Sequence, residues 1–353
     1  MNAYLVLENG KTFMGEFFGK PADVTGEIVF TTGMNGFMET VTDPSHYGQI
    51  VLQTFPLIGN SGVISTDLES DAVSVKAYIC KYLCQEPSNF RSEGDLDTFF
   101  IQKGITGVKG IDTRELTKII RDHGTICGKI TSALPTSADQ QETKTYNVQN
   151  AIAAVSCKTP SVLGNGTHKI ALLDLGVKKS IVDALVERGC QVHIFPHNAT
   201  VNEIMEIEPD GVLISDGPGN PEAEENKEIV QTIKNLVTMF KVFGIGMGHL
   251  LLAMAHGHKV EKLKHGHYGA NQPVKDVKTG RLYITNQSHS YTVVMQKNGT
   301  FDIEKTSATF VNVNDGTCEG LQYYDLSYSV SFCPATGPKD TQFLFDRFIE
   351  RLV

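Results

Sequence analysis

From Thr167 onward the chain alternates short apolar runs with helix-type stretches, and this alternation restricts its fold more than any other feature. Strands are predicted at 170–175, 191–195 and 211–215, and helices at 180–188, near 201–207 and from 221 to 240. A fourth strand and a further helix are predicted within 242–255. Because each strand is followed by a helix that returns the chain, the strands run parallel and helices cover both faces of the sheet. Residues 167–353 are therefore predicted to form a doubly wound, mostly parallel α/β domain.

The first part of the chain has a different character. Short β-type runs such as Tyr4–Leu7 and Glu27–Thr31 alternate with turns rich in Gly and Asn, which predicts a β-rich α/β domain over residues 1–150. Residues 136–150 are polar and show no periodicity, and residues 151–166 add Pro and Gly. We therefore place the domain boundary here, with 151–166 as a linker.

One helix of the first domain carries clear signals at both ends. Asp112 is followed three residues later by Glu115, the pattern of a capping box. Gly124 stands where a left-handed residue would end the helix. The sequence therefore predicts a helix between Asp112 and Gly124.

The stretch Val242–Ala255 is predicted to be a strand, a tight turn and a helix, with alternating glycines at Gly244, Gly246 and Gly248. Three interpretations of these residues compete. A dinucleotide-binding turn would need a glycine where His249 stands and normally follows the first strand, not the fourth. A purely structural turn needs nothing more. A nucleophile elbow presents one reactive side chain at its tip, and here the tip, Gly246, has none.

A second glycine-rich turn follows the preceding strand and contains Gly217-Pro-Gly219. Asn220 and Pro221 after it are a good cap and first-turn pair for the next helix. Ligands of doubly wound sheets bind at the carboxyl ends of the strands, so both glycine-rich turns lie at the functional edge. Together they can present backbone amides to a ligand oxygen, as an oxyanion hole does.

The acidic balance of the chain restricts its partners. A net charge of −9 argues against nonspecific attraction to nucleic acid or to an anionic membrane surface. No apolar run approaches the length of a membrane span, and residues 1–10 lack the pattern of a secretory signal. We expect a cytoplasmic protein whose partners are small molecules or another protein.

The cysteines indicate reduced, structural thiols. There are seven, an odd number, in a chain too large to depend on disulfides. Cys80 and Cys84 share a face of a helix or strand, but no second pair completes a zinc site, so we expect no metal site. The thiols expected to be structural are those of Cys80, Cys84, Cys127, Cys157, Cys190 and Cys318.

Several further motifs occur along the whole chain. They are Thr31-Thr-Gly-Met-Asn-Gly36, Thr42-Asp-Pro-Ser45, Pro56-Leu-Ile-Gly-Asn60, Gly110-Ile-Asp-Thr-Arg114, Ser215-Asp-Gly-Pro-Gly-Asn-Pro221, His265-Gly-His-Tyr-Gly-Ala-Asn-Gln-Pro273, Gln287-Ser-His289 and Leu344-Phe-Asp346. On these motifs the second half resembles a class I glutamine amidotransferase domain, and nearly the whole chain resembles the small subunits of carbamoyl-phosphate synthase. The motifs of the first half are specific to that family, because other amidotransferases lack that domain.

The resemblance implies a catalytic triad that this sequence does not have. In active relatives a cysteine at the elbow tip attacks the side-chain amide of glutamine, a histidine protonates departing ammonia and a glutamate orients the histidine. The corresponding positions here are Gly246, Cys333 and Ala335. Because triad members act as a unit, the loss of one costs on the order of a millionfold in rate, about 8 kcal/mol of barrier. The segment after Cys333 is also shorter than in the family.

The resemblance also implies a glutamine-binding site, much of which depends on backbone groups. The positions that match it are Ser45, Gly217, Gly219, Met247, Leu250, Ser288, Ser290 and Tyr291. Leu250 replaces a glutamine that helps to bind the substrate. A buried polar group of glutamine that loses its partner there costs about 1–3 kcal/mol, so we expect weak glutamine binding at most.

The function implied is that of a small chain that docks on a large subunit, which makes carbamoyl phosphate for arginine or pyrimidine synthesis. In active relatives the small chain supplies ammonia from glutamine. We predict that this glutaminase is lost or severely impaired here, leaving a structural or regulatory subunit of an ammonia-dependent synthetase. No cofactor is expected in this chain, since ATP and magnesium would belong to the large subunit.

Two alternatives remain open at the level of sequence. One is an active glutaminase with a rewired site, in which Cys333 is the nucleophile and His249 its base. The other is a free-standing binding protein without catalytic function. Labelling by a glutamine-analogue electrophile tests the first, and co-purification with a large subunit tests the second.

Overall fold

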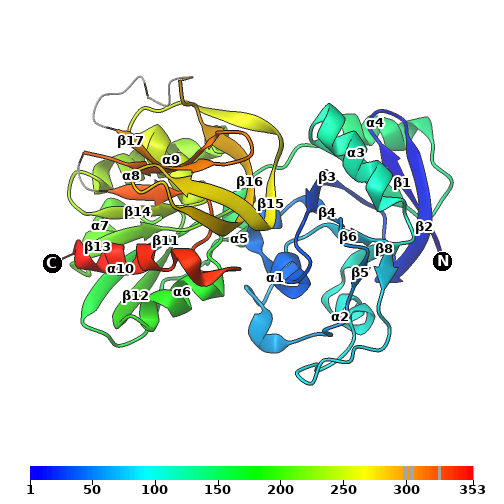
Figure 1. Ribbon diagram of the computed structural model, residues 1–353, viewed down its shortest axis with the longest axis horizontal. Helices are drawn as coiled ribbons and strands as arrows, with labels where there is room; N and C mark the ends of the chain where they lie inside the picture. The colour runs from blue at the N-terminus through cyan, green and yellow to red at the C-terminus, as the bar shows by residue number, and fades with distance from the viewer. Residues whose placement is uncertain (297–300, 302–305, 325–326, 353) are drawn as a thin grey trace. The chain divides into compact units, whose positions relative to one another are not determined.

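The computed structural model describes residues 1–296, 301, 306–324 and 327–352 (Figure 1). The chain folds as two compact units, the first comprising Met1–Gln149 with Lys264–Gly269 and the second Asn150–Leu263 with Ala270–Val353. Among the described residues, no helix combines the length and the apolar character that crossing a membrane requires.

A closed barrel forms the centre of the first unit. Its strands follow the order β1-β2-β8-β6-β4-β3-β9. Their bounds are Asn2–Leu7 (β1), Thr12–Gly19 (β2), Val24–Thr31 (β3), Gln49–Gln53 (β4), Ala77–Cys80 (β6), Thr106–Lys109 (β8) and Ile126–Thr131 (β9). Successive side chains of a strand enter different buried clusters, as Ile28 and Val29 do, because they point to opposite faces. The prediction of a β-rich first part is confirmed.

Shorter elements surround this barrel. A small second sheet pairs β5 with β7. The remaining elements are β5 (Leu57–Ile58), β7 (Tyr82–Leu83), α1 (Phe37–Thr42), α2 (Leu96–Lys103), α3 (Thr113–His123), α4 (Ser137–Thr145) and the 3-10 turns η1 (Pro44–His46) and η2 (Ser65–Asp67). The predicted Asp112 cap of α3 is confirmed, since its carboxylate accepts from the Glu115 amide at 2.9 Å. The reciprocal half of the predicted capping box is wrong, because the Glu115 side chain pairs with Lys11 instead.

The lack of periodicity in the polar stretch 136–150 suggested irregular structure, but the stretch contains helix α4. Helix α4 begins with a reciprocal capping box between Thr136 and Asp139. Its apolar content is small, so the hydrophobic period gave no signal of a helix here. Lys129 from β9 pairs with Asp139 and with Glu142, which fastens this helix to the barrel.

The second unit is built on a ten-stranded sheet of order β10-β12-β11-β13-β14-β19-β18-β17-β15-β16. Five neighbouring strands, from β12 to β19, are parallel. The strands are β10 (Ser161–Leu163), β11 (His168–Asp174), β12 (Cys190–Pro196), β13 (Gly211–Ile214), β14 (Val242–Ile245), β15 (Val260–Asp276), β16 (Leu282–Val293), β17 (Ser307–Asn312), β18 (Cys318–Gln322) and β19 (Tyr328–Val330). The predicted α/β class is confirmed, but the antiparallel strands after α9 extend the sheet further than the alternation predicted.

Helices cover both faces of this sheet (Figure 1). They are α5 (Ala151–Val155), α6 (Lys179–Val186), α7 (Val201–Met205), α8 (Lys227–Leu236), α9 (Met247–Ala255) and α10 (Phe343–Glu350), with the turns η3 (Glu224–Asn226) and η4 (Lys339–Thr341). Ile233 of α8 and Leu251 of α9 pack in one buried cluster with Val212. Leu185 of α6 and Phe345 of α10 pack in another with Leu213, the next residue of β13. This is the doubly wound arrangement.

Two local predictions need correction. Asn220 and Pro221 do not begin a helix, because α8 starts at Lys227. The Asn220 side chain instead accepts from the Glu222 amide at 3.0 Å and stabilises a turn before η3. The stretch 151–166 is more than a connector, since it contains α5 and β10, and β10 pairs with β12.

Candidate active site in the second unit

The turn between β14 and α9 has the backbone of a nucleophile elbow. Gly246, at its tip, has φ 56° and ψ −113°, a conformation that residues with a side chain adopt only under strain. The turn is also crowded, because a Cβ at Gly244 would lie 2.7 Å from the carbonyl oxygen of Gly248. The elbow keeps its shape, and its tip carries no side chain.

Two backbone amides, one from each glycine-rich turn, converge on a single oxygen. The Gly217 amide donates to Oδ1 of Asp216 at 2.8 Å, and the Met247 amide donates to the same atom at 3.1 Å. The sequence predicted that the two turns would present amides to a ligand oxygen. It did not predict that a side chain of this chain supplies the oxygen.

The other oxygen of Asp216 forms a buried ion pair. The Lys178 ammonium lies 2.7 Å from Oδ2, and both side chains are almost completely buried. Lys178 precedes α6 directly, and Asp216 follows β13. Burying two charges is costly, and such a pair persists when good geometry and further hydrogen bonds compensate for the lost water. Here the two amides on Oδ1 supply those bonds.

The Asp216 carboxylate also fills the space above the elbow tip. A Cβ built on Gly246 would lie within 3.0 Å of both Oδ1 and Cγ of Asp216. Real Cβ atoms essentially never approach other atoms so closely. A side chain at the tip and the observed position of this carboxylate therefore exclude each other.

Cys333 and Ala335, the other two triad positions, lie beyond β19. The Gly246 amide donates to the Val330 carbonyl at 2.9 Å, so β19 ends beside the elbow. Cys333 is buried three residues further on, and its amide donates to the Asn286 carbonyl of β16 at 3.0 Å. The Asn286 side chain in turn donates to Thr336 Oγ1 at 2.7 Å. This segment is fixed by backbone and amide bonds.

His249, in the first turn of α9, is fully buried. Its Nδ1 lies 2.7 Å from Ser329 Oγ, and among the described residues its Nε2 has no hydrogen-bond partner. Burial lowers the pKa of this imidazole to about 3, although the carboxylate of Glu319 opposes the shift. The side chain is therefore neutral at pH 7 and a poor base, which disfavours it as the activator of Cys333.

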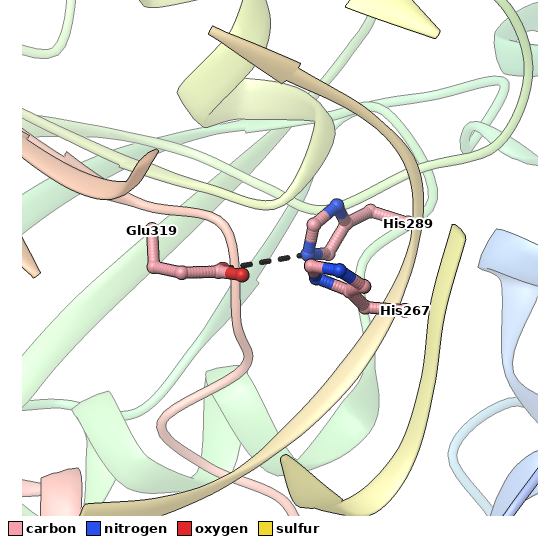
Figure 2. Close-up of side chains that lie close together, drawn as sticks. All are labelled: His267, His289 and Glu319. Carbon is pink, nitrogen blue, oxygen red and sulfur yellow. Dashed lines mark ion pairs between the residues drawn. The ribbon is translucent and has the colours of Figure 1, made fainter. Parts of the chain in front are cut away.

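A further buried polar pair was not singled out from the sequence. His289 of β16 lies 3.4 Å from Glu319 of β18, measured from Nε2 to Oε2 (Figure 2). Asn312 donates to the other oxygen of Glu319 at 3.0 Å, and Ser331 also contacts this carboxylate. Imidazole and carboxylate are metal-ligand types, but His267, also drawn in Figure 2, lies on Lys264–Gly269, which groups with the first unit. No metal centre is therefore assigned to this pair.

The remaining positions matched to glutamine binding are distributed over both units. Ser45 lies in η1 of the first unit, where it is buried and, among the described residues, its Oγ makes no hydrogen bond. Leu250 of α9 packs in the apolar core. Gly219 has φ +96° in the Gly217 turn, and Ser288, Ser290 and Tyr291 lie on β16. Within the second unit, the contacts above bring Gly217, Gly246 and Met247 together.

Comparisons with known proteins give a consistent result. Residues 5–130 match the family described as carbamoyl-phosphate synthase small chain, CPSase domain, and residues 171–351 match glutamine amidotransferase class I. The chain is 42% identical to the carbamoyl phosphate synthase small chain of Clostridium perfringens, over 99% of both chains. It is 41% identical to the pyrimidine-specific small chain of Bacillus subtilis, over 100% of this chain and 96% of that one. It is also 42% identical to the small chain of Fusobacterium nucleatum, over 99% of this chain and 98% of that one.

Proposed function

Since the chain belongs to the family of carbamoyl-phosphate synthase small chains, we propose that it is a small chain whose own glutaminase activity is lost or severely impaired. A small chain of this enzyme implies a large subunit as partner. In this proposal the assembled enzyme makes carbamoyl phosphate from free ammonia, and the small chain has a structural or regulatory role.

The observation that carries the proposal is Gly246 at the tip of an otherwise regular elbow. Attack on the amide carbon of glutamine requires a nucleophile at that point, and glycine has no side chain to supply one. Cys333 and Ala335 stand at the positions of the histidine and the glutamate. Because the triad works as a unit, these further losses add little to a defect that is already complete.

The rest of the proposal follows from the family and from charge. ATP and magnesium belong to the large subunit, and this chain carries no cofactor of its own. With Leu250 in the apolar core, glutamine binds weakly at most. The net charge of −9 favours a protein partner over nucleic acid or an anionic membrane, and we place the enzyme in the cytoplasm, serving arginine or pyrimidine synthesis.

The test is synthesis of carbamoyl phosphate by the purified chain with its large subunit, fed either ammonium or ammonium-free glutamine. We expect product from ammonium and at most a millionth of the normal glutamine-dependent rate. The matched control is the same large subunit with a small chain that has an intact Cys-His-Glu triad. Glutamine-dependent turnover close to that of the control would disprove the proposal.

A glutamine-analogue electrophile separates this proposal from a rewired site. We expect no covalent adduct on Cys333, because His249 is a poor base and Cys333 has no place at the elbow tip. Mass spectrometry after incubation of the assembled enzyme measures this directly. An adduct on Cys333 that free glutamine suppresses would favour the rewired glutaminase.

A further inference from the structure

We propose that the Asp216 carboxylate is an internal ligand of an oxygen-binding site, and that it keeps the acyl oxygen of glutamine out of that site. The site consists of the amides of Gly217 and Met247 and the ammonium of Lys178. The inference deepens the proposed function and rests on it, because it gives a second obstacle to glutamine hydrolysis, one that glycine at the elbow tip makes possible.

The two amides have the geometry that stabilises a developing oxyanion. Donors at such a site lie about 2.7–3.1 Å from the oxygen they bind. Gly217 and Met247 donate at 2.8 and 3.1 Å, and both donate to Oδ1 of Asp216. An oxygen of glutamine can reach these donors only after Oδ1 has left them.

Lys178 makes that exchange unfavourable. Its buried ammonium contacts Oδ2 of Asp216 at 2.7 Å. If the neutral amide of glutamine replaced the carboxylate, the buried Lys178 ammonium would lose the negative charge of Asp216, and removing one member of a buried ion pair is strongly destabilising. A negatively charged carboxylate is therefore the ligand class that this site prefers.

The tip residue and the carboxylate depend on each other. A Cβ on Gly246 would collide with Oδ1 and Cγ of Asp216. Glycine at the tip thus provides the volume that the carboxylate occupies. Substituting cysteine for Gly246 would therefore force Asp216 away from its three partners.

The test removes the Asp216 carboxylate from the site and adds a small carboxylate, formate, to the solution. Asp216→Ala removes one carboxylate group, which is the volume of formate, and leaves Lys178 and both amides in place. We expect this variant to unfold at a lower temperature than the parent chain in sodium chloride, and to be stabilised by sodium formate of equal ionic strength. At a formate concentration ten times its Kd, the folding equilibrium should shift about tenfold.

The control is the double variant Lys178→Met/Asp216→Ala, which has no buried cation and should fold without formate. Formate should leave its unfolding temperature unchanged. The inference is wrong if formate stabilises both variants equally, or if it fails to stabilise or rescue Asp216→Ala while the double variant folds. The readout is thermal unfolding of the full chain, so this result does not depend on whether the glutaminase is active.

Discussion

The first turn of α9 takes part in two buried polar contacts, one with a charged group and one with a neutral group. The Met247 amide donates to Asp216, which is charged and paired with Lys178. Two residues later, His249 meets the Ser329 hydroxyl, and burial keeps its imidazole neutral. The elbow thus has a charged, hydrogen-bonded carboxylate on one side, that of Asp216. The imidazole of His249 beside it is neutral at pH 7.

The largest expected effect on stability comes from disrupting the ion pair between Lys178 and Asp216. Lys178→Met leaves the Asp216 carboxylate buried without its cation, and we expect a loss of about 3–5 kcal/mol in the free energy of unfolding. Lys178→Met/Asp216→Leu removes both charges and should recover most of that loss. Denaturant unfolding of the two variants and the parent measures the difference. Equal losses in the single and double variants would show that packing, and not charge, holds this region.

A smaller effect tests whether Asp216 depends on glycine at the tip. We expect Gly246→Ala to cost about 3 kcal/mol, from backbone strain and from the displaced carboxylate together. Gly280→Ala is a control for positive φ without a steric clash, because Gly280 has φ +74° and open space around its Cβ position. Strain alone should cost about 1–2 kcal/mol there. If the two variants lose the same stability by denaturant unfolding, the carboxylate does not occupy the tip volume.

The buried, neutral imidazole of His249 should make the stability of the protein depend on pH. In the unfolded chain His249 titrates near 6.5, whereas burial lowers the pKa in the folded protein to about 3. The unfolded chain therefore binds more protons between these values, so stability is complete above pH 6.5 and falls as the pH drops. Between pH 6.5 and 4.5 we expect His249 to account for about 2–3 kcal/mol.

The matched variant for this prediction is His249→Gln, which keeps an amide able to bond Ser329 and cannot titrate. Its stability should fall less than that of the parent over the same pH range, as measured by urea unfolding. His258, whose pKa burial lowers to about 4, remains in both proteins and contributes equally. Parallel pH curves for parent and variant would contradict the assignment of a buried, neutral His249.

Much of this architecture was predictable because its signals are local. The elbow lies in one short stretch of sequence, and its strand, glycines and apolar helix follow directly from residue pattern. The cap on α3 is likewise a contact between residues three positions apart. Patterns of this kind specify which turn forms and at which edge of the sheet.

The contacts that decide what the site does were not predictable, because they join distant residues. Lys178 and Asp216 are 38 positions apart, and each alone resembles an ordinary surface charge. His289 and Glu319 meet across the antiparallel extension of the sheet, which the strand and helix alternation did not foresee. Only the folded chain brings these side chains together, and no local pattern records their pairing.

The source of the nitrogen in carbamoyl phosphate distinguishes an ammonia-dependent enzyme from a glutamine-dependent one. The assembled enzyme is given glutamine labelled with 15N in its side-chain amide together with an equal concentration of unlabelled ammonium, and the carbamoyl phosphate is analysed by mass spectrometry. We expect the product to carry unlabelled nitrogen. Product enriched in 15N while the free ammonium stays unlabelled would contradict this expectation, because the amide of glutamine would then have been hydrolysed within the complex.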